Sequence, residues 1–387
     1  MQVKHVENRT VVIKIGTGVI ANGDGSLALE RLQMILDQIS EFHRHGYRFL
    51  VVSSGAVGLG KKYLGMSGKL SLKQKQACAA SGQSLLMHTY QSLLSNRQIK
   101  CAQVLLTADD LGERKRYLAL RDTLEQLLSL GVIPIINEND AVSTQELETF
   151  GKEKNFGDND KLSALVAAKI DADILILLTD VDGLYDKNPK NHPDAKIIKI
   201  VEKHEDLKTF STDGKSDLGR GGMMTKVEAM RIATVSGSHC VIASGFIDQT
   251  IKNILTCEDL TDIKRPGTLG IPAASMNKKK RWIGFSAHNY GNVVVNLGAA
   301  RALIEKNASL LSVGVIKTEG SFSPGDTVNI VDENGTVLGK GISYFSNNDI
   351  DIIKGLSSHR ISELLPNSNQ DVVIQRDNMV IFKEIKQ

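Results

Sequence analysis

The chain has 387 residues, and at about 150 residues per domain this length favours two or three domains. It carries 47 lysines and arginines against 44 aspartates and glutamates, and 41% of its residues are hydrophobic. These values exclude a polyelectrolyte and a disordered chain of low hydrophobicity. No apolar run approaches the roughly 18 residues of a membrane span, and the N-terminus lacks an apolar stretch of secretory-signal length.

The four cysteines stand far apart, with no CxxC pair and no histidine at ligand spacing: Cys78, Cys101, Cys240 and Cys257. This distribution argues against a zinc site and a disulfide framework. It favours a reducing compartment, so we expect a cytoplasmic protein with no membrane association and no dedicated metal ligands.

Over the first two-thirds of the chain, short apolar runs alternate with amphipathic segments of helix length. Strands are predicted at 11–13, 49–52, 102–106, 132–136, 174–178 and 240–243, with helices over 29–42, 72–95, 118–128, 162–169 and 225–236. Strands that are apolar throughout and joined by helices are typical of a mostly parallel sheet covered on both faces. We therefore expect an α/β fold, a three-layer αβα sandwich.

The alternation of strands and helices stops near residue 265, where prolines and glycines interrupt any helix. The basic run 278–281 is interpreted as a solvated linker. Beyond it, Asn334-Gly335 between two apolar runs predicts a β-hairpin, since Asn-Gly tolerates the positive φ of such turns. One helix over 298–306 and a strand at 372–374 complete a small β-rich domain.

Ligands of an open parallel sheet bind beyond the carboxyl ends of its strands, so the residues that follow each strand are the candidates. Lys14, with Gly16 and Gly18 behind it, can reach a phosphate, although a solvated lysine in a turn fits the pattern equally well. Ser54 and Gly55 can bind a carboxylate or a phosphoryl group, but small residues also serve tight packing of helix on sheet.

Three further strand or helix ends carry amides and carboxylates. Asn137 and Asp140 lie in a turn that can hold the ammonium and carboxylate groups of an amino acid, or that is simply solvated. The run Asp158-Asn159-Asp160 precedes a helix and has more polar groups than an N-terminal cap needs. Thr179-Asp180 can line a nucleotide pocket or form an ordinary turn.

The most specific element is a glycine-rich loop that runs directly into a helix: Gly219, Arg220, Gly221, Gly222, Met223, Met224, Thr225 and Lys226. Glycines at a helix N-terminus offer backbone N–H groups and the positive end of the helix dipole to an anion. Lys226 adds a full positive charge. A flexible surface loop is the alternative interpretation.

No histidine or cysteine near these loops is placed to act as a nucleophile. Phosphoryl transfer depends on positioning and charge neutralisation more than on covalent chemistry by the protein. Two lysines, glycine-lined backbone and a carboxylate that can hold both lysines therefore indicate a phosphoryl-transfer site.

The ordered motifs resemble those of the amino-acid kinase family, in its branch that phosphorylates the side-chain carboxylate of L-glutamate. The matching segments are 12–17, 53–56, 136–142, 157–160, 178–180 and 219–226. Residues 280–283, 298–299 and 322–326 resemble a PUA domain. The resemblance implies a kinase domain over 1–270, a PUA domain over 277–357 and a C-terminal extension over 358–387.

The resemblance also implies the role of each residue. The reaction would be ATP-dependent formation of L-glutamyl 5-phosphate, the first step of proline biosynthesis. Lys14 and Lys226 would neutralise charge on the phosphoryl group, and Asp160 would pair with both. The remaining residues would bind glutamate (Ser54, Gly55, Asn137, Asp140, Asp158 and Asn159) or ATP (Lys14, Thr179, Asp180 and 220–226). ATP would bring Mg²⁺, L-proline would be a feedback inhibitor, and the protein would form a dimer or tetramer.

Two segments depart from the family pattern: Arg220 stands where a small hydroxyl residue is common, and residues 144–156 are long and charged. Within the fold, N-acetylglutamate or aspartate is the alternative acceptor. A different alternative is an RNA-binding protein acting through the PUA domain. Residues 275–387 hold 9 Lys and 4 Arg against 11 Asp and Glu, a net charge of +2, so we do not expect RNA binding as the main function.

Overall fold

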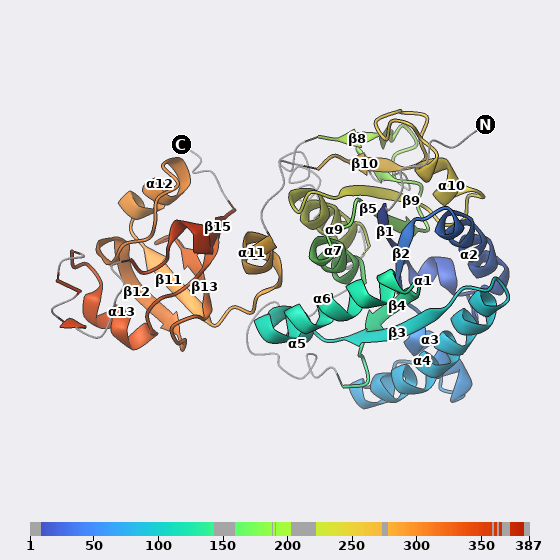
Figure 1. Cartoon of the computed structure of the whole chain (residues 1–387), viewed down its shortest axis with the longest axis horizontal. Coiled ribbons are helices and arrows are strands. Elements are labelled where there is room, and N and C mark those ends of the chain that lie inside the picture. Colours follow the sequence, from blue (N-terminus) through green and yellow to red (C-terminus); the bar gives the residue numbers. More distant parts are fainter. Residues whose placement is uncertain are drawn as a thin grey trace. The chain divides into compact units, whose positions relative to one another are not determined.

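The computed structural model describes residues 9–142, 159–187, 189, 191–202, 222–272, 278–357, 360–361, 364–365 and 372–382. The chain divides into two compact units, residues 1–111 with 115–275, and residues 112–114 with 276–387. Each unit has its own sheet (Figure 1). Each also has its own apolar core. Among the described helices, none combines the length and the apolar character that crossing a membrane requires.

The first unit is built on a sheet that contains eight strands in the described part of the chain, in the order β3-β4-β2-β1-β5-β9-β10-β8. The strands are β1 (Thr10–Ile15), β2 (Arg48–Ser53), β3 (Cys101–Leu106), β4 (Ile133–Glu138), β5 (Ile174–Thr179), β8 (Ile200–Val201), β9 (His239–Ser244) and β10 (Thr268–Gly270). The six strands from β3 to β9 in this order are parallel, and β10 runs antiparallel to β9. The expected mostly parallel sheet is confirmed.

Helices cover both faces of this sheet (Figure 1). The helices are α1 (Thr17–Ile20), α2 (Leu29–Arg44), α3 (Ala56–Tyr63), α4 (Leu72–Ser95), α5 (Ala108–Gly112), α6 (Arg114–Ser129), α7 (Asn159–Lys169), α9 (Met223–Val235) and α10 (Thr250–Leu255). A large apolar core joins α2, α4 and α10 to one face. Helices α7 and α9 pack on each other and on the other face, which gives the predicted three layers.

Side chains alternate between the two faces along each strand, and this decides where the charged residue of β1 points. Val11, Ile13 and Ile15 belong to the core beneath α2 and α4. Lys14 stands between Ile13 and Ile15 and therefore faces the α7–α9 layer. It is 3% exposed, so its ammonium group needs a partner inside the protein.

The second unit has a five-stranded sheet in its described part, in the order β12-β11-β13-β14-β15. The strands are β11 (Gly291–Val295), β12 (Val315–Gly320), β13 (Thr327–Val331), β14 (Val337–Ile342) and β15 (Met379–Ile381), with helices α12 (Leu297–Glu305) and α13 (Asn347–Ile353). The predicted hairpin is present as β13–β14, and Gly335 in its turn has φ +80°.

Two predictions for this region are wrong. The basic run is not an irregular linker that is solvated throughout: Lys278–Arg281 forms helix α11, and although Lys279 is exposed, Arg281 is only 6% exposed and the following Trp282 is buried. The strand predicted at 372–374 is reduced to an isolated bridge between Ile374 and Leu310. The strand of this segment is β15, which pairs with β14, so the C-terminal residues return to the sheet.

Two short strands near the carboxyl end of β5, β6 (Leu184–Tyr185) and β7 (Ile197–Ile198), pair with each other. Like β8 and β10, they have only two or three residues. Patterns this short give no periodicity that a sequence can reveal.

Candidate active site

The sheet order places a topological switch point at its centre. Strand β1 lies between β2 and β5, and the chain leaves β2 toward one edge of the sheet and β5 toward the other. Crevices of this kind, beyond the carboxyl ends of the strands, are where open α/β sheets bind ligands. The ends of β1, β2, β4 and β5 carry the residues that the sequence singled out.

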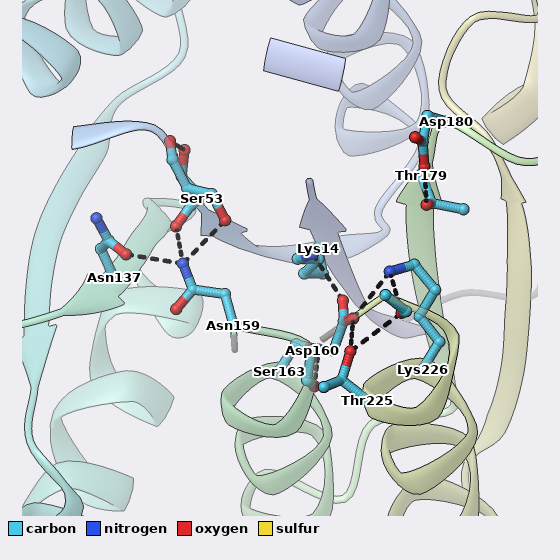
Figure 2. A network of polar contacts seen from close by, with 12 residues as sticks. Lys14, Ser53, Asn137, Asn159, Asp160, Ser163, Thr179, Asp180, Thr225 and Lys226 are labelled. Carbon is cyan, nitrogen blue, oxygen red and sulfur yellow. Dashed lines mark hydrogen bonds and ion pairs between the residues drawn. The ribbon is translucent and has the colours of Figure 1, made fainter. Parts of the chain in front are cut away.

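A buried carboxylate holds two lysines at this point (Figure 2). Asp160, in the first turn of α7, has no exposed surface, and its Oδ1 lies 2.6 Å from the Nζ of Lys14. Its Oδ2 lies 3.2 Å from the Nζ of Lys226 and accepts a hydrogen bond of 2.9 Å from the Thr225 hydroxyl. Residues 14 and 226, which are far apart in sequence, therefore meet at one carboxyl group.

The charge state of Asp160 follows from these neighbours. Burial raises the pKa of its carboxyl group, but the charges of Lys14 and Lys226 and the hydrogen bonds from Lys14 and Thr225 outweigh burial, so the pKa lies below its ordinary value. Asp160 is thus an anion at neutral pH and cannot act as a proton donor there. Among the described residues, the ammonium groups of Lys14 and Lys226 thus share the carboxylate of Asp160.

Helix α9 brings Thr225 and Lys226 to this cluster from its first turn. The Lys226 ammonium also donates a hydrogen bond of 2.9 Å to the Gly222 carbonyl, which fixes the side chain against the helix start. No side chain caps the Gly222 end of α9 within the described residues. Met224 is 45% exposed beside it, so this helix start presents backbone N–H groups next to two ammonium groups.

A second polar cluster lies on the other side of Asp160 (Figure 2). The Asn159 side-chain amide donates to the Ser53 carbonyl at 2.7 Å, to the Ser54 hydroxyl at 3.0 Å and to the Asn137 Oδ1 at 3.0 Å. Because these acceptors end β2 and β4, Asn159 ties the start of α7 to both strands. Asn137 in turn donates to the Oε1 of Gln83 on α4 at 2.8 Å.

Close backbone contact between α3 and α4 shapes this cluster. Gly55 starts α3 with φ +98°, a left-handed conformation that favours glycine. A Cβ at Gly82 would lie 1.9 Å from the Ala56 carbonyl oxygen, and one at Gly60 would lie 1.8 Å from the Cys78 carbonyl oxygen. Only glycines allow the two helices to approach this closely, and α4 brings Gln83 to Asn137 at the end of β4.

The remaining predicted residues lie around the two clusters. Thr179 is buried at the end of β5, and its hydroxyl donates to the exposed Asp180 at 3.0 Å, on the Lys226 side of the site (Figure 2). Asp140 is half-buried and lines a pocket of about 230 Å³ together with Ala56 and Gln83. Neither Asp140 nor Asp180 is part of the ion-pair cluster.

Comparison of the sequence with known protein families and proteins shows which family it matches. The amino acid kinase family matches residues 9–244, and the PUA domain matches residues 291–365. A protein named glutamate 5-kinase from Caldanaerobacter subterraneus subsp. tengcongensis is 40% identical over 96% of this chain and 98% of its own length. One from Methanococcoides burtonii is 42% identical over 96% of each chain.

The chain belongs to the amino acid kinase family. Among solved structures, carbamate kinase from Giardia lamblia bound to AMP-PNP is similar at a TM-score of 0.48, with 18% sequence identity. That likeness covers 69% of this chain and 99% of the other. Membership of the family implies that the protein is a kinase that uses ATP.

Three residues that the sequence proposed for this amino acid kinase site lie outside the described residues: Asp158, Arg220 and Gly221. The charged segment 144–156 lies outside them as well. Arg220 and this segment are the two departures from the family pattern noted above.

Sequence reasoning missed Gln83 and the supporting role of Gly16. Gln83 is a polar residue on the apolar stripe of α4, beside Ala79 and Leu86, and a polar residue in a buried stripe is the signal that could have found it. A Cβ at Gly16 would lie 3.4 Å from the Lys14 Nζ and 3.2 Å from the Leu178 carbonyl oxygen. The missing side chain therefore leaves room for the ammonium group.

Proposed function

We propose that this protein is a glutamate 5-kinase, which transfers the γ-phosphoryl group of ATP to the side-chain carboxylate of L-glutamate. The single observation that carries the proposal is Asp160 in contact with Lys14 and Lys226 at the switch point of an amino acid kinase sheet. The relatives that match almost the whole chain bear that name and support the choice of substrate.

In this reaction an oxygen of the glutamate side-chain carboxylate forms a bond to the γ-phosphorus, and the bond from that phosphorus to the bridging oxygen of ADP breaks. The acceptor has an unperturbed pKa near ~4.3 and is already ionised at neutral pH, so no general base is required. This fits a site in which the buried carboxylate of Asp160 is paired with two lysines.

What the reaction does require is neutralisation of charge, because an anion attacks a polyanion. The ammonium groups of Lys14 and Lys226 would contact the transferring phosphoryl oxygens, and Asp160 would hold both in place. Gly222, Met223, Met224 and Thr225 at the start of α9, with Thr179 and Asp180 at the end of β5, would bind the nucleotide. Arg220 and Gly221 are proposed for the same role from the sequence alone.

Glutamate would bind on the other side of the cluster, at Ser54, Gly55, Asn137, Asp140 and Asn159, with Asp158 added from the sequence. The amide and hydroxyl groups here suit carboxylate oxygens, and Asp140 suits an ammonium group. L-Proline would act as a feedback inhibitor at or near this region. N-Acetylglutamate fits less well because its acylated nitrogen carries no charge for Asp140 to pair with.

Mg²⁺ is the cation that we propose to accompany ATP. Within the described residues, no group of three His, Cys, Asp or Glu side chains could hold a metal ion. Mg²⁺ is commonly bound by substrate phosphates, waters and one or two carboxylates. On the proposed nucleotide side, Asp180 at the end of β5 is exposed and would be the carboxylate that holds the ion. The ion would neutralise charge on the phosphates.

We also propose a cytoplasmic location and a homo-oligomer, a dimer or a tetramer. The four cysteines are all free thiols, as is usual in a reducing compartment. RNA binding by the PUA domain is not part of the proposed function, because the net charge of +2 over residues 275–387 gives little attraction for phosphates.

The decisive experiment supplies the purified protein with ATP, Mg²⁺ and hydroxylamine and measures ADP and hydroxamate with L-glutamate, N-acetyl-L-glutamate or L-aspartate as acceptor. We expect ADP and hydroxamate in equal amounts with L-glutamate, at a kcat/KM at least 100-fold above the other acceptors. ADP release that does not depend on L-glutamate, or a preference for another acceptor, would overturn the assignment.

A further inference from the structure

Gln83 is a buried residue of the amino acid side of the site that has no role in the function proposed above. It lies on α4 and is only 8% exposed. Its neighbour Gly82 lets α3 approach α4 in backbone contact, so the Gln83 side chain reaches Asn137 at the end of β4. Burying a long polar side chain in an otherwise apolar stripe costs free energy unless its polar atoms form hydrogen bonds.

The hydrogen bonds of Asn137 determine which way the Gln83 amide points. The Asn137 Oδ1 accepts from the Glu138 backbone N–H at 2.9 Å and from the Asn159 amide at 3.0 Å. A backbone N–H can only donate, so this atom of Asn137 must be its oxygen. The Asn137 Nδ2 is therefore the group that donates to Gln83, and the Gln83 atom facing it is Oε1.

It follows that Gln83 presents its NH₂ group elsewhere. The Nε2 atom is buried and has no hydrogen-bond partner among the described residues. Burying an amide donor without a partner costs free energy, so buried amides are nearly always satisfied. Gln83 lines the pocket of about 230 Å³ that also contains Asp140, Asn139 and Ala56. A ligand acceptor group in this pocket would satisfy the Nε2 donor.

We propose that Gln83 binds the α-carboxylate of the acceptor amino acid through the NH₂ group of its side chain. The proposal rests on the proposed function, because it takes the acceptor to be an amino acid whose other carboxylate is phosphorylated. That second carboxylate must reach Lys14 on β1, and β1 is two strands away from β4, roughly 10 Å at the usual strand spacing.

The polarity of the pocket supports this orientation of the substrate. Asp140 lines the same pocket and supplies the negative charge that an α-ammonium group requires. Glu138 lines this pocket as well. An amide donor beside carboxylates is complementary to a carboxylate and an ammonium group on one carbon atom. The side chain of the acceptor would then extend from this pocket past Asn159 toward the lysines.

The test uses Gln83→Glu, which keeps an oxygen to accept from Asn137 and replaces only the NH₂ group. If Gln83 merely holds Asn137, this variant is close to wild type. If Gln83 binds the α-carboxylate, the new carboxylate repels it, and the KM for L-glutamate rises at least 30-fold while the KM for ATP changes less than threefold. Gln91→Glu, which adds the same charge at an exposed position about two turns further along α4, is the matched control.

A second substrate identifies the carboxylate that is bound. L-Isoglutamine keeps the side-chain carboxylate and has an amide in place of the α-carboxylate, so its NH₂ group can donate to the introduced glutamate. We expect the preference for L-glutamate over L-isoglutamine, measured as the ratio of kcat/KM, to fall at least 100-fold in Gln83→Glu and to stay within threefold of wild type in Gln91→Glu.

An unchanged KM for L-glutamate in a folded Gln83→Glu variant would overturn the proposal, as would equal losses with both substrates. Gln83→Met, of similar volume, gives an independent check: it loses the donor without adding charge, and its KM for L-glutamate is expected to rise about tenfold. Failure of the proposed function is a separate result, because the wild-type protein would then show no activity that depends on L-glutamate.

Discussion

Asn159 and Asp160 are consecutive residues, yet their side chains belong to two different polar clusters. Asn159 donates to groups at the ends of β2 and β4, whereas Asp160 pairs with Lys14 on β1 and Lys226 on α9. The first turn of α7 therefore connects the proposed amino acid side of the site with the proposed phosphoryl side. A displacement of that turn would affect both sides together.

The first prediction concerns the charge of Lys226. Lys226→Met keeps the length of the side chain and removes its ammonium group, and we expect kcat to fall by about 10²–10³-fold, the usual cost of losing one donor to transition-state charge. Steady-state kinetics with saturating ATP and L-glutamate measures the effect. Lys62→Met, which breaks an exposed ion pair with Asp24, is the control and is expected to leave kcat within twofold of wild type.

The second prediction is that Lys226 and Asp160 act as a unit. Asp160→Asn leaves two largely buried ammonium groups without their anion, so it is expected to lower the free energy of unfolding by about 3–5 kcal/mol as well as kcat. The double variant Lys226→Met/Asp160→Asn should then lose less than the sum of the two single losses, both in stability and in kcat. Additive losses in a double-mutant cycle would show that the two residues act independently.

The third prediction concerns the hydrogen bonds of Asn159. Asn159→Asp replaces the donor by an acceptor that faces the Ser53 carbonyl and the Asn137 Oδ1. We expect a loss of about 1–3 kcal/mol in the free energy of unfolding and a higher KM for L-glutamate, because α7 can no longer hold the ends of β2 and β4. Urea denaturation and kinetics measure both. A variant with wild-type stability would contradict the bridging role.

The fourth prediction concerns the contact of α3 with α4. Gly82→Ala would place a methyl group 1.9 Å from the Ala56 carbonyl oxygen, so the helices must separate. We expect a loss of several kcal/mol in stability and a strong loss of L-glutamate binding. Gly58→Ala is the matched control: it lies in α3 with no atom near its Cβ, and it is expected to stabilise the protein by about 0.5–1 kcal/mol.

The fifth prediction is a pH dependence of stability that arises away from the site. Lys169, at the end of α7, is 2% exposed and donates to the Tyr117 carbonyl. Burial, with the nearby charge of Arg121, lowers the pKa of its ammonium group from 10.5 to about 7. Between these values the unfolded chain binds more protons than the native one, so this group makes stability rise with pH from about 7 toward 10.5.

The measurement compares wild type with Lys169→Met. The free energy of unfolding of wild type minus that of the variant should increase over this pH range, by an amount on the order of a few kcal/mol. Lys161→Met, on the same helix at a half-buried position, is the control. A difference between wild type and Lys169→Met that is independent of pH would contradict the prediction.

Much of the fold could be predicted from the sequence because its strands are short, continuous apolar runs. The runs around Val12, Leu50 and Leu175 are buried on both faces, and such strands occur only in covered parallel sheets. The short strands β8 and β10 and the helix α11 could not be predicted, since two to four residues carry no period. A basic run such as 278–281 is expected to be solvated from its sequence, because the burial of Arg281 appears only in the folded chain.

The site could be predicted less completely than the fold. Lys14 and Lys226 could be singled out by the glycines around them, but no sequence pattern gives the 2.6 Å and 3.2 Å distances to Asp160. Gln83 carries no motif at all. Its place in the site depends on the glycine contact between α3 and α4 and on the direction of a chain of amide hydrogen bonds, both of which are properties of the folded chain.

The position of β1 between β2 and β5 also has a consequence for how the protein is made. During synthesis Lys14 appears long before Asp160, and β1, β2 and β4 can pair before α7 exists. In that partial sheet the ammonium group of Lys14 stays in water, because the α7–α9 layer that covers this face is still absent, and covering it without Asp160 would bury an unpaired charge. Productive closure is therefore expected to await β5 and α9, so that folding of the unit and assembly of its charge cluster become one late, cooperative event.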